Sequence, residues 1–507
     1  MKNKGKIIII IIILILIVIL AGLIIYSNTK TKYNQVEKFT MCKIIDSTQI
    51  EINNYQENKM PFTIESSDDV EIMINGIKYE KGKRIYKTGK YEIKISNKER
   101  AEKATVYIKD IERSNEHEYN IYSVLTTLPT LFSSMNIVKN PEQQGYYWTK
   151  RISTIDIEKL REHCPNLEIS EYINIQSEEN YDKSIDMEMK SYVERILKQD
   201  PNAYFIVHVD EFRFYAEFPL FAELGLTDNR YSINIYTDGT LSYTRKYEIA
   251  EERKYEKFQE EKKTYEDLLN QIRSNTYDSK KIYKVAEYLM NSKSYENYNY
   301  NYLLISTLKD NVNYLLQYPD LIKFEDKRVA KEMEKANFSK IVAQEQFSEI
   351  SEDGKNIFFD LINFNKQEMD EKYFNQQDKG DYLIITGAKP FYGTVTQKEF
   401  EEYIGIICDK YKDKYTILYK PHPSALPDEE QEKFLTDHNI KVLPGRIPME
   451  AISYIYPNLK LGGFASSLYM SVDEGKTLFF FARNKELLVD PLNILYDDLF
   501  SNAEFIH

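Results

Sequence analysis

The stretch of the chain from Thr416 to Ala482 restricts the possible folds more than any other. It contains two apolar, strand-like runs at 417–419 and 478–482, with small and polar residues between them. The side chains there that are able to bind a ligand are Lys420, His422, Glu450, Ser466 and Ser467. In open α/β sheets the ligand crevice lies outside the carboxyl ends of the strands. The stretch therefore predicts an α/β fold with a binding site at strand ends.

The residue types in this stretch suit a nucleotide. A carboxylate accepts hydrogen bonds from a base or ribose, whereas a cation, an imidazole and two hydroxyls suit a phosphate. Each feature alone also has a plain structural interpretation. A His-Pro pair such as His422-Pro423 is most often a turn, and Gly462-Gly463 is typical of a tight bend.

Length and charge limit the remaining possibilities. The 507 residues are too many for one compact core and suffice for about three domains. A net charge of −13 argues against a general role in binding nucleic acid. The three cysteines are scattered and show neither a disulfide framework nor zinc-site spacing.

The N-terminus has the pattern of a membrane anchor. Residues 1–6 carry three lysines, and residues 7–26 follow as 20 uncharged residues. As a helix they would be ~30 Å long, which matches one bilayer core. A cleaved signal peptide would have a shorter apolar region and a small-residue cleavage site. We therefore expect an uncleaved transmembrane helix in a single-pass cell-membrane protein. The lysines favour a cytoplasmic N-terminus and place the rest of the chain outside.

Two further segments precede the α/β region. Residues 27–60 are polar and predict a linker. Residues 61–112 alternate apolar and polar side chains, and Gly76, Gly82 and Gly89 separate short runs. This spacing predicts a small β-sandwich. The segment resembles the bacterial immunoglobulin-like repeats of surface proteins, which implies a spacer without a ligand.

The α/β region is predicted to form two halves, at 113–350 and 351–507. In the first half, 119–138 predicts strand, loop and helix, and 203–209 predicts a buried strand. Within that strand we expect His208 to be a packed histidine, and Asp210 and Glu211 lie at its end. Residues 282–316 and 327–346 predict mainly helix, and 355–364 predict strand and loop.

Two more predicted strands end in small or polar residues. The strand in 232–243 ends at Thr237-Asp238-Gly239, which by itself is typical of a hairpin turn. The strand that begins the second half ends at Thr386-Gly387. By itself, that pair is an ordinary exit from a strand to a loop.

Taken in order, these motifs resemble the bacterial sialyltransferases of glycosyltransferase family 80. The resemblance covers Leu128 to about Ala482 and rests on LPTL at 128–131, TDG at 237–239, TG with an aromatic at 386–391, KPHP at 420–423, and SSLY at 466–469. Glu450 lies 28 residues after His422 and 16 before Ser466, close to the family's spacing. The chain departs from the family at Thr237, where the family has an acid, and at Pro421, where it has glycine.

The resemblance implies a GT-B fold, in which two Rossmann-like domains face each other. It further implies an inverting transfer of sialic acid from CMP-sialic acid to a glycan hydroxyl. Asp238 would be the base, and His422 would assist the leaving phosphate. Asp238 and Phe391 would contact the acceptor. The donor-binding residues implied are Thr386, Gly387, Lys420, His422, Pro423, Glu450, Ser466 and Ser467. No cofactor and no metal are expected, since CMP leaves as a phosphate monoester and the sequence has no Asp-x-Asp motif.

Two alternatives remain open at this point. The departures at Thr237 and Pro421 fit a non-catalytic surface protein in which a degenerate GT-B domain binds glycans. A transferase that uses another CMP-sugar, such as CMP-Kdo, would have the same residues at the nucleotide.

Overall fold

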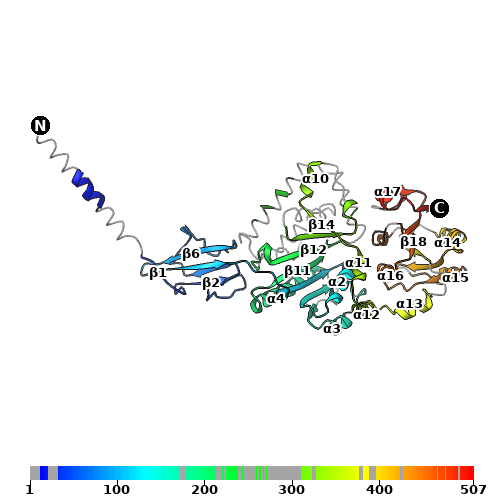
Figure 1. The fold of residues 1–507 in the computed structure, drawn as a ribbon, viewed down its shortest axis with the longest axis horizontal. Helices are drawn as coiled ribbons and strands as arrows, with labels where there is room; N and C mark the ends of the chain where they lie inside the picture. The colour runs from blue at the N-terminus through cyan, green and yellow to red at the C-terminus, as the bar shows by residue number, and fades with distance from the viewer. Residues whose placement is uncertain are drawn as a thin grey trace. The chain divides into compact units, whose positions relative to one another are not determined.

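The computed structural model describes residues 12–20, 32–151, 153–171, 178–211, 220–221, 224–237, 243, 259, 262–263, 266–267, 270, 310–321, 327–375, 381–387, 396–422, 426–464, 466–473, 475–488 and 492–507. The chain divides into two compact units, the first ending at Ile111 and the second beginning at Glu112 (Figure 1).

The first unit is an all-β domain. Its strands are β1 (Asn34–Gln35), β2 (Cys42–Asp46), β3 (Phe62–Ser66), β4 (Glu71–Ile74), β5 (Ile77–Lys78), β6 (Gly89–Ser96) and β7 (Ala101–Ile108). One sheet has the order β1-β7-β6-β4-β5, and β2 and β3 form a second, two-stranded sheet. Alternate residues of both sheets, among them Ile64, Ile93 and Val106, are buried in one core. The two sheets therefore form two layers around that core, and the immunoglobulin-like assignment stays a prediction.

The predicted linker at 27–60 is wrong for most of its length. Residues from 34 onward supply β1 and β2, and Phe39, Ile44, Ile52 and Tyr55 are buried in the same core as β3. The Phe39 amide also donates a hydrogen bond to the Tyr55 hydroxyl at 3.2 Å. The apolar residues of this segment are too sparse to form an alternating pattern in the sequence. Because they are buried in the core, the segment belongs to the β domain.

Only part of the predicted anchor at 7–26 belongs to the described residues. Residues 12–20 are helical, and their apolar side chains are exposed. Across the portion of the chain that the structure describes, no helix is both long enough and apolar enough to span a bilayer. The anchor therefore stays a prediction.

The second unit begins with a seven-stranded sheet of order β10-β9-β8-β11-β12-β13-β14, in which every neighbouring pair is parallel. Its strands are β8 (Glu118–Val124), β9 (Gly145–Thr149), β10 (Leu167–Ile169), β11 (Tyr204–Asp210), β12 (Tyr231–Tyr236), β13 (Val312–Leu316) and β14 (Asn337–Lys340). The helices around it are α2 (Thr127–Lys139), α3 (Ile157–His163), α4 (Glu178–Gln199), α10 (Lys327–Met333), α11 (Ala343–Ser348) and α12 (Glu352–Leu361). Parallel neighbours require crossover connections, and these helices supply several of them.

A six-stranded parallel sheet of order β17-β16-β15-β18-β19-β20 follows. Its strands are β15 (Tyr382–Gly387), β16 (Thr416–Pro421), β17 (Lys441–Val442), β18 (Lys460–Gly463), β19 (Thr477–Phe481) and β20 (Glu504–Ile506). The helices of this half are α13 (Lys366–Lys372), α14 (Gln397–Tyr411), α15 (Glu429–Asp437), α16 (Met449–Ile455), α17 (Tyr496–Leu499) and the 3-10 helix η6 (Ser467–Met470). The predicted α/β architecture with two halves is thereby confirmed.

The prediction of strand and loop at 355–364 is wrong, because α12 covers most of this range. Ser351 caps the helix, and Phe358 and Leu361, one turn apart, are buried. The carbonyl of Leu361 accepts a hydrogen bond from the Asp156 amide at 2.6 Å, so the helix packs beside α3. The consecutive apolar residues at 357–359 suggested a strand, whereas the cap and the spacing of the buried residues stabilise a helix.

Candidate functional site

The carboxyl ends of three central strands of the six-stranded sheet lie side by side. β15 pairs with β16 on one side and with β18 on the other. In the register of these pairs, Thr386 lies opposite Lys420 and also opposite Gly463. The predicted strand-end residues of this half therefore share one edge of one sheet, as the sequence pattern predicted.

Two glycines allow β18 to fit between its neighbours. A Cβ on Gly462 would lie 2.3 Å from the ring of Phe479 on β19. Gly463 has a φ of +126°, and a Cβ there would lie 2.7 Å from the Thr386 carbonyl oxygen. Side chains at these positions would collide with the sheet, so the glycine pair is required for the close packing of β15, β18 and β19.

Thr386 uses its hydroxyl inside the protein. The side chain is buried, and Oγ1 lies 2.7 Å from the hydroxyl of Tyr469. It also donates toward the carbonyls of Gly462 at 3.2 Å and Phe464 at 3.3 Å. Thr386 therefore ties the end of β15 to the segment that leads into η6. Gly387, also predicted to bind the donor, is the last residue of β15.

Lys420 is a buried cation at the end of β16. Its Nζ donates to the carbonyl of Pro421 at 3.1 Å and to the carbonyl of Gly445 at 3.0 Å. Burial lowers the pKa of Lys420 to about 8, and the nearby Glu450 carboxylate acts in the opposite direction. The ammonium therefore joins the end of β16 to the loop before α16.

Glu450 lies in the first turn of α16 and is half-buried. Burial raises its pKa, whereas a hydrogen bond from its own amide and the charge of Lys420 lower the pKa. A carboxylate in a partly dehydrated site binds hydroxyl donors more strongly than one in water, because little competing solvent surrounds it.

His422 follows β16 directly and is half-buried. Burial, and after it the charge of Lys420, lowers the pKa of the imidazole. The ring is therefore neutral at pH 7, with one N–H donor and one acceptor nitrogen. Ser466, also half-buried, caps η6 by accepting a hydrogen bond from the Leu468 amide at 3.3 Å.

Several predicted site residues lie partly or wholly outside the described set. Asp238, Phe391 and Pro423 are not among the described residues, and Ser467 is described only as the first residue of η6. Among the residues that are described, the predicted donor site comprises Thr386, Gly387, Lys420, His422, Glu450 and Ser466.

Other residues that the sequence analysis named lie at the carboxyl edge of the seven-stranded sheet. The buried carboxylate of Asp210 accepts hydrogen bonds from the amides of Leu125 and, at 3.1 Å, Thr126. It thereby holds the start of α2. Thr237 is buried immediately after β12, and its amide donates to the Leu315 carbonyl on β13 at 3.2 Å.

His208 is the packed histidine that the sequence predicted. Its ring stacks on Tyr122 with centroids 4.6 Å apart, and Nδ1 lies 2.9 Å from the hydroxyl of Tyr236. Burial lowers its pKa to about 3, so the ring stays neutral. Its contacts stabilise the first sheet.

Within the described ranges, no group of three or more histidine, cysteine, aspartate or glutamate side chains is arranged to hold a metal ion.

Comparison with known proteins identifies the fold. No protein-family model and no curated protein sequence matches the chain. Solved structures do match. The GT-B domain of the Photobacterium damselae sialyltransferase aligns with a TM-score of 0.51 and 16% identity, over 76% of this chain and 99% of that chain. The fold of the second unit is GT-B.

Two other bacterial sialyltransferases resemble the chain. The α/β-galactoside α-2,3-sialyltransferase of Photobacterium phosphoreum has a TM-score of 0.53 at 17% identity, covering 76% of this chain and 98% of that chain. The 2,6-sialyltransferase of Photobacterium sp. JT-ISH-224, solved with CMP and lactose, has a TM-score of 0.51 at 15% identity and covers 94% and 97%. The wider match also includes residues before Glu112.

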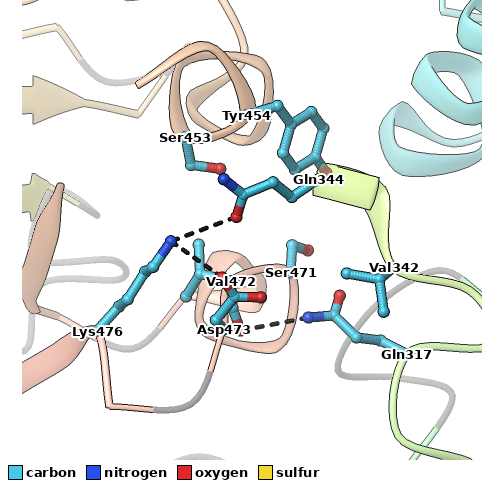
Figure 2. A pocket seen from close by; sticks show the side chains of 9 residues that line it. All are labelled: Gln317, Val342, Gln344, Ser453, Tyr454, Ser471, Val472, Asp473 and Lys476. Carbon is cyan, nitrogen blue, oxygen red and sulfur yellow. Dashed lines mark hydrogen bonds and ion pairs between the residues drawn. The ribbon is translucent and has the colours of Figure 1, made fainter. Parts of the chain in front are cut away.

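The two halves of the GT-B fold meet at a small polar pocket (Figure 2). Gln317, at the end of β13, donates from Nε2 to the Val472 carbonyl at 3.2 Å, and the Tyr318 hydroxyl donates to the same oxygen at 2.6 Å. On the opposite wall, Lys476 Nζ donates to Gln344 Oε1 at 3.4 Å.

The sequence interpretation missed Gln317 and Tyr318. Both residues follow β13, which the sequence pattern assigned to helix. The apolar residues Val312, Leu315 and Leu316, which precede them, were the available signal of a strand exit.

Proposed function

We propose that the chain is a glycosyltransferase that moves sialic acid from CMP-sialic acid to a galactose-type hydroxyl of a glycan, with inversion and without a metal. The observation that supports the proposal most is the arrangement of Lys420, His422, Glu450 and Ser466 around adjacent strand exits of a GT-B fold. These residues also match, in order, motifs of the sialyltransferases that the sequence resembles.

On the donor side, each residue has a role that its chemistry permits. Glu450 accepts hydrogen bonds from the ribose hydroxyls of CMP. His422 is neutral and donates one N–H to the leaving phosphate, with Ser466 and Ser467 as further donors. These bonds strengthen as charge develops on the phosphate through an oxocarbenium-like transition state. Lys420 holds the surrounding backbone and adds positive charge.

On the acceptor side, Asp238 removes the proton from the attacking hydroxyl. The aromatic face of Phe391 contacts the apolar side of a galactose ring. Lactose and CMP in the complex of the Photobacterium sp. JT-ISH-224 enzyme support a sugar acceptor and a cytidine nucleotide here. The leaving group is a phosphate monoester, so side-chain donors suffice and the proposed reaction is insensitive to EDTA.

The central experiment measures CMP release and product formation from CMP-sialic acid and lactose. Asp238→Ala should reduce transfer by roughly 10²–10⁴-fold with little change in CMP affinity, because the base contacts the acceptor. His422→Ala should reduce kcat by roughly 10²–10³-fold and weaken CMP binding, because a donor to the leaving phosphate is lost. The exposed His438 provides the matched control, His438→Ala, which should behave as wild type.

The outcomes separate the proposal from its alternatives. Near-normal transfer by Asp238→Ala would place the base elsewhere. Absence of CMP release from the wild type, with retained glycan binding, would favour the non-catalytic glycan-binding protein suggested by Thr237 and Pro421. Turnover of CMP-Kdo in preference to CMP-sialic acid would retain the fold and the nucleotide site and change the donor sugar.

We further propose that residues 7–26 anchor the protein as a single membrane helix, with a cytoplasmic N-terminus and the catalytic unit outside. The nine exposed apolar residues at 12–20 support an apolar environment for this helix. Treating intact cells with protease tests the orientation, and a protected catalytic unit would reverse it.

A further inference from the structure

Tyr318 connects the two halves of the GT-B fold through a single backbone oxygen. Tyr318 follows β13 of the seven-stranded sheet, and its hydroxyl donates to the Val472 carbonyl at 2.6 Å. The adjacent Gln317, which is buried, donates to the same oxygen at 3.2 Å (Figure 2). Two neighbouring side chains of one half therefore hold one point of the other half.

That point belongs to the segment that carries the predicted phosphate donors. Val472 is separated from the end of η6 by one residue, Ser471, whose amide donates to the Leu468 carbonyl at 2.8 Å. Ser471 and Val472 are both buried. Ser466, η6 and Val472 therefore belong to one short, hydrogen-bonded segment. A shift of the Val472 carbonyl, which Tyr318 holds, would move Ser466 and η6 with it.

The backbone of Tyr318 contacts a residue that lies close in sequence to the predicted base. Its amide donates to the hydroxyl of Tyr243 at 2.9 Å, and the two rings pack with centroids 6.5 Å apart. Tyr243 is fully buried. Thr237 is bonded to Leu315, three residues before Tyr318. The described residues on either side of 238–242, the segment that contains the predicted base, are therefore both bonded to the exit of β13.

We propose that Tyr318 is a positioning residue of the transferase, which fixes the donor-phosphate segment relative to the end of β12, which the predicted base follows in the sequence. This inference rests on the proposed function. Transfer requires the acceptor hydroxyl and the donor carbon to be held in a near-attack geometry, and an error of about 1 Å can cost ~10²-fold in rate. A hydrogen bond between the two halves limits how far they can move apart.

The test uses Tyr318→Phe in the full chain, which removes the hydroxyl and keeps the ring against Tyr243. We expect kcat for transfer to fall by about 10-fold or more, while the Kd for CMP changes by less than about 3-fold because no donor contact is removed. Hydrogen exchange of residues 468–473 should become faster, since the segment loses one of its bonds. Gln317→Met removes the second donor and should act in the same direction.

Tyr382→Phe is the matched control. Tyr382 also donates its hydroxyl to a backbone carbonyl, that of Asn375 at 3.0 Å, but at the start of β15 and not at its end. This variant should lose a similar amount of stability and keep wild-type kcat and wild-type exchange at 468–473.

The outcomes distinguish this inference from the proposed function. Unchanged exchange at 468–473 in both Tyr318→Phe and Gln317→Met would overturn the link itself, whatever the activity. Faster exchange with wild-type kcat would overturn the positioning role. A wild type that binds CMP but transfers no sugar would instead contradict the proposed transferase, and the exchange measurement would still decide whether the link exists.

Discussion

Lys420 has a structural role in addition to the nucleotide contact that is proposed for it. From the sequence, it was expected to contact the nucleotide. In the structure, its ammonium donates to the carbonyls of Pro421 and Gly445, and it is almost wholly buried. Because the contact with Gly445 joins residues 25 positions apart through a loop, no local pattern in the sequence could have predicted it.

The buried charge makes a pH dependence of stability predictable. The pKa of Lys420 is lowered from 10.5 to about 8 in the folded protein. Between these values the unfolded chain holds the proton and the folded chain does not, so the free energy of unfolding rises with pH across this window. Below pH 8 both states are charged, and the cost of burying the charge is fully present.

The variant Lys420→Met isolates this effect. We expect the free energy of unfolding of the wild type, relative to the variant, to rise from pH 8 to pH 9.5 by at most about 1.4 kcal/mol per pH unit. Urea unfolding of both proteins at pH 7.5, 8.5 and 9.5 measures it, since the titration of cysteines and tyrosines is common to both. A difference that stays constant or falls with pH would show that Lys420 keeps its proton when folded.

At the scale of elements, the exits of the parallel strands could be predicted because buried runs end abruptly in small or polar residues. The sequence therefore located the ends of β11, β12, β15 and β16, and the glycines of β18. Strands buried on both faces have nearly continuous apolar character, which makes them visible in a single sequence.

The elements that were missed are short or lack such a run. β13 and β14 lie within ranges predicted as helix, and β1 and β2 within the predicted linker. In β14 the two end residues are exposed and the two middle residues are half-buried, so few of its side chains had to be apolar. Tertiary pairing with a neighbouring strand, and not local preference, determines these strands. Gln317 and Tyr318, which follow β13 and bond to the Val472 carbonyl, were missed for the same reason.

The glycine pair of β18 provides a prediction at this scale. Gly462→Ala should lower the stability of the second unit by ~1–3 kcal/mol, because the new methyl group would meet the Phe479 ring at 2.3 Å. Gly405 lies inside α14, and beyond the backbone of its own helix no atom lies within 4 Å of the place that a Cβ would take, so Gly405→Ala should instead stabilise by ~0.5–1 kcal/mol. Thermal melting of both variants measures the contrast, and equal melting temperatures would contradict the packing described.

At the scale of the whole molecule, the chain consists of two units that each have their own buried core. The first unit buries apolar residues of both of its sheets, and the second contains both halves of the GT-B fold. All the residues assigned to the proposed reaction belong to the second unit. The sequence could not place the start of the first unit, because its early strands are short and polar.

Removing residues 1–111 should therefore leave a folded protein. We expect a chain that begins at Glu112 to bind CMP with the affinity of the full chain, because the division between the units lies at this residue. Calorimetric titration with CMP, together with circular dichroism, measures binding and folding. Aggregation of the shorter chain, or lost affinity for CMP, would show that the first unit supports the second.

The parallel pairing of both large sheets also has consequences for folding kinetics. Tyr122 pairs with His208, 86 residues later, and Ile384 pairs with Leu461, 77 residues later. Such loops must close before their contacts form, which slows folding and prolongs the exposure of incomplete sheet edges. In the first unit, by contrast, β6 turns directly into β7. The chain's one tryptophan, Trp148, is buried in the seven-stranded sheet. Its fluorescence during refolding from urea should therefore report the slow folding of the second unit and be insensitive to the faster folding of the first unit.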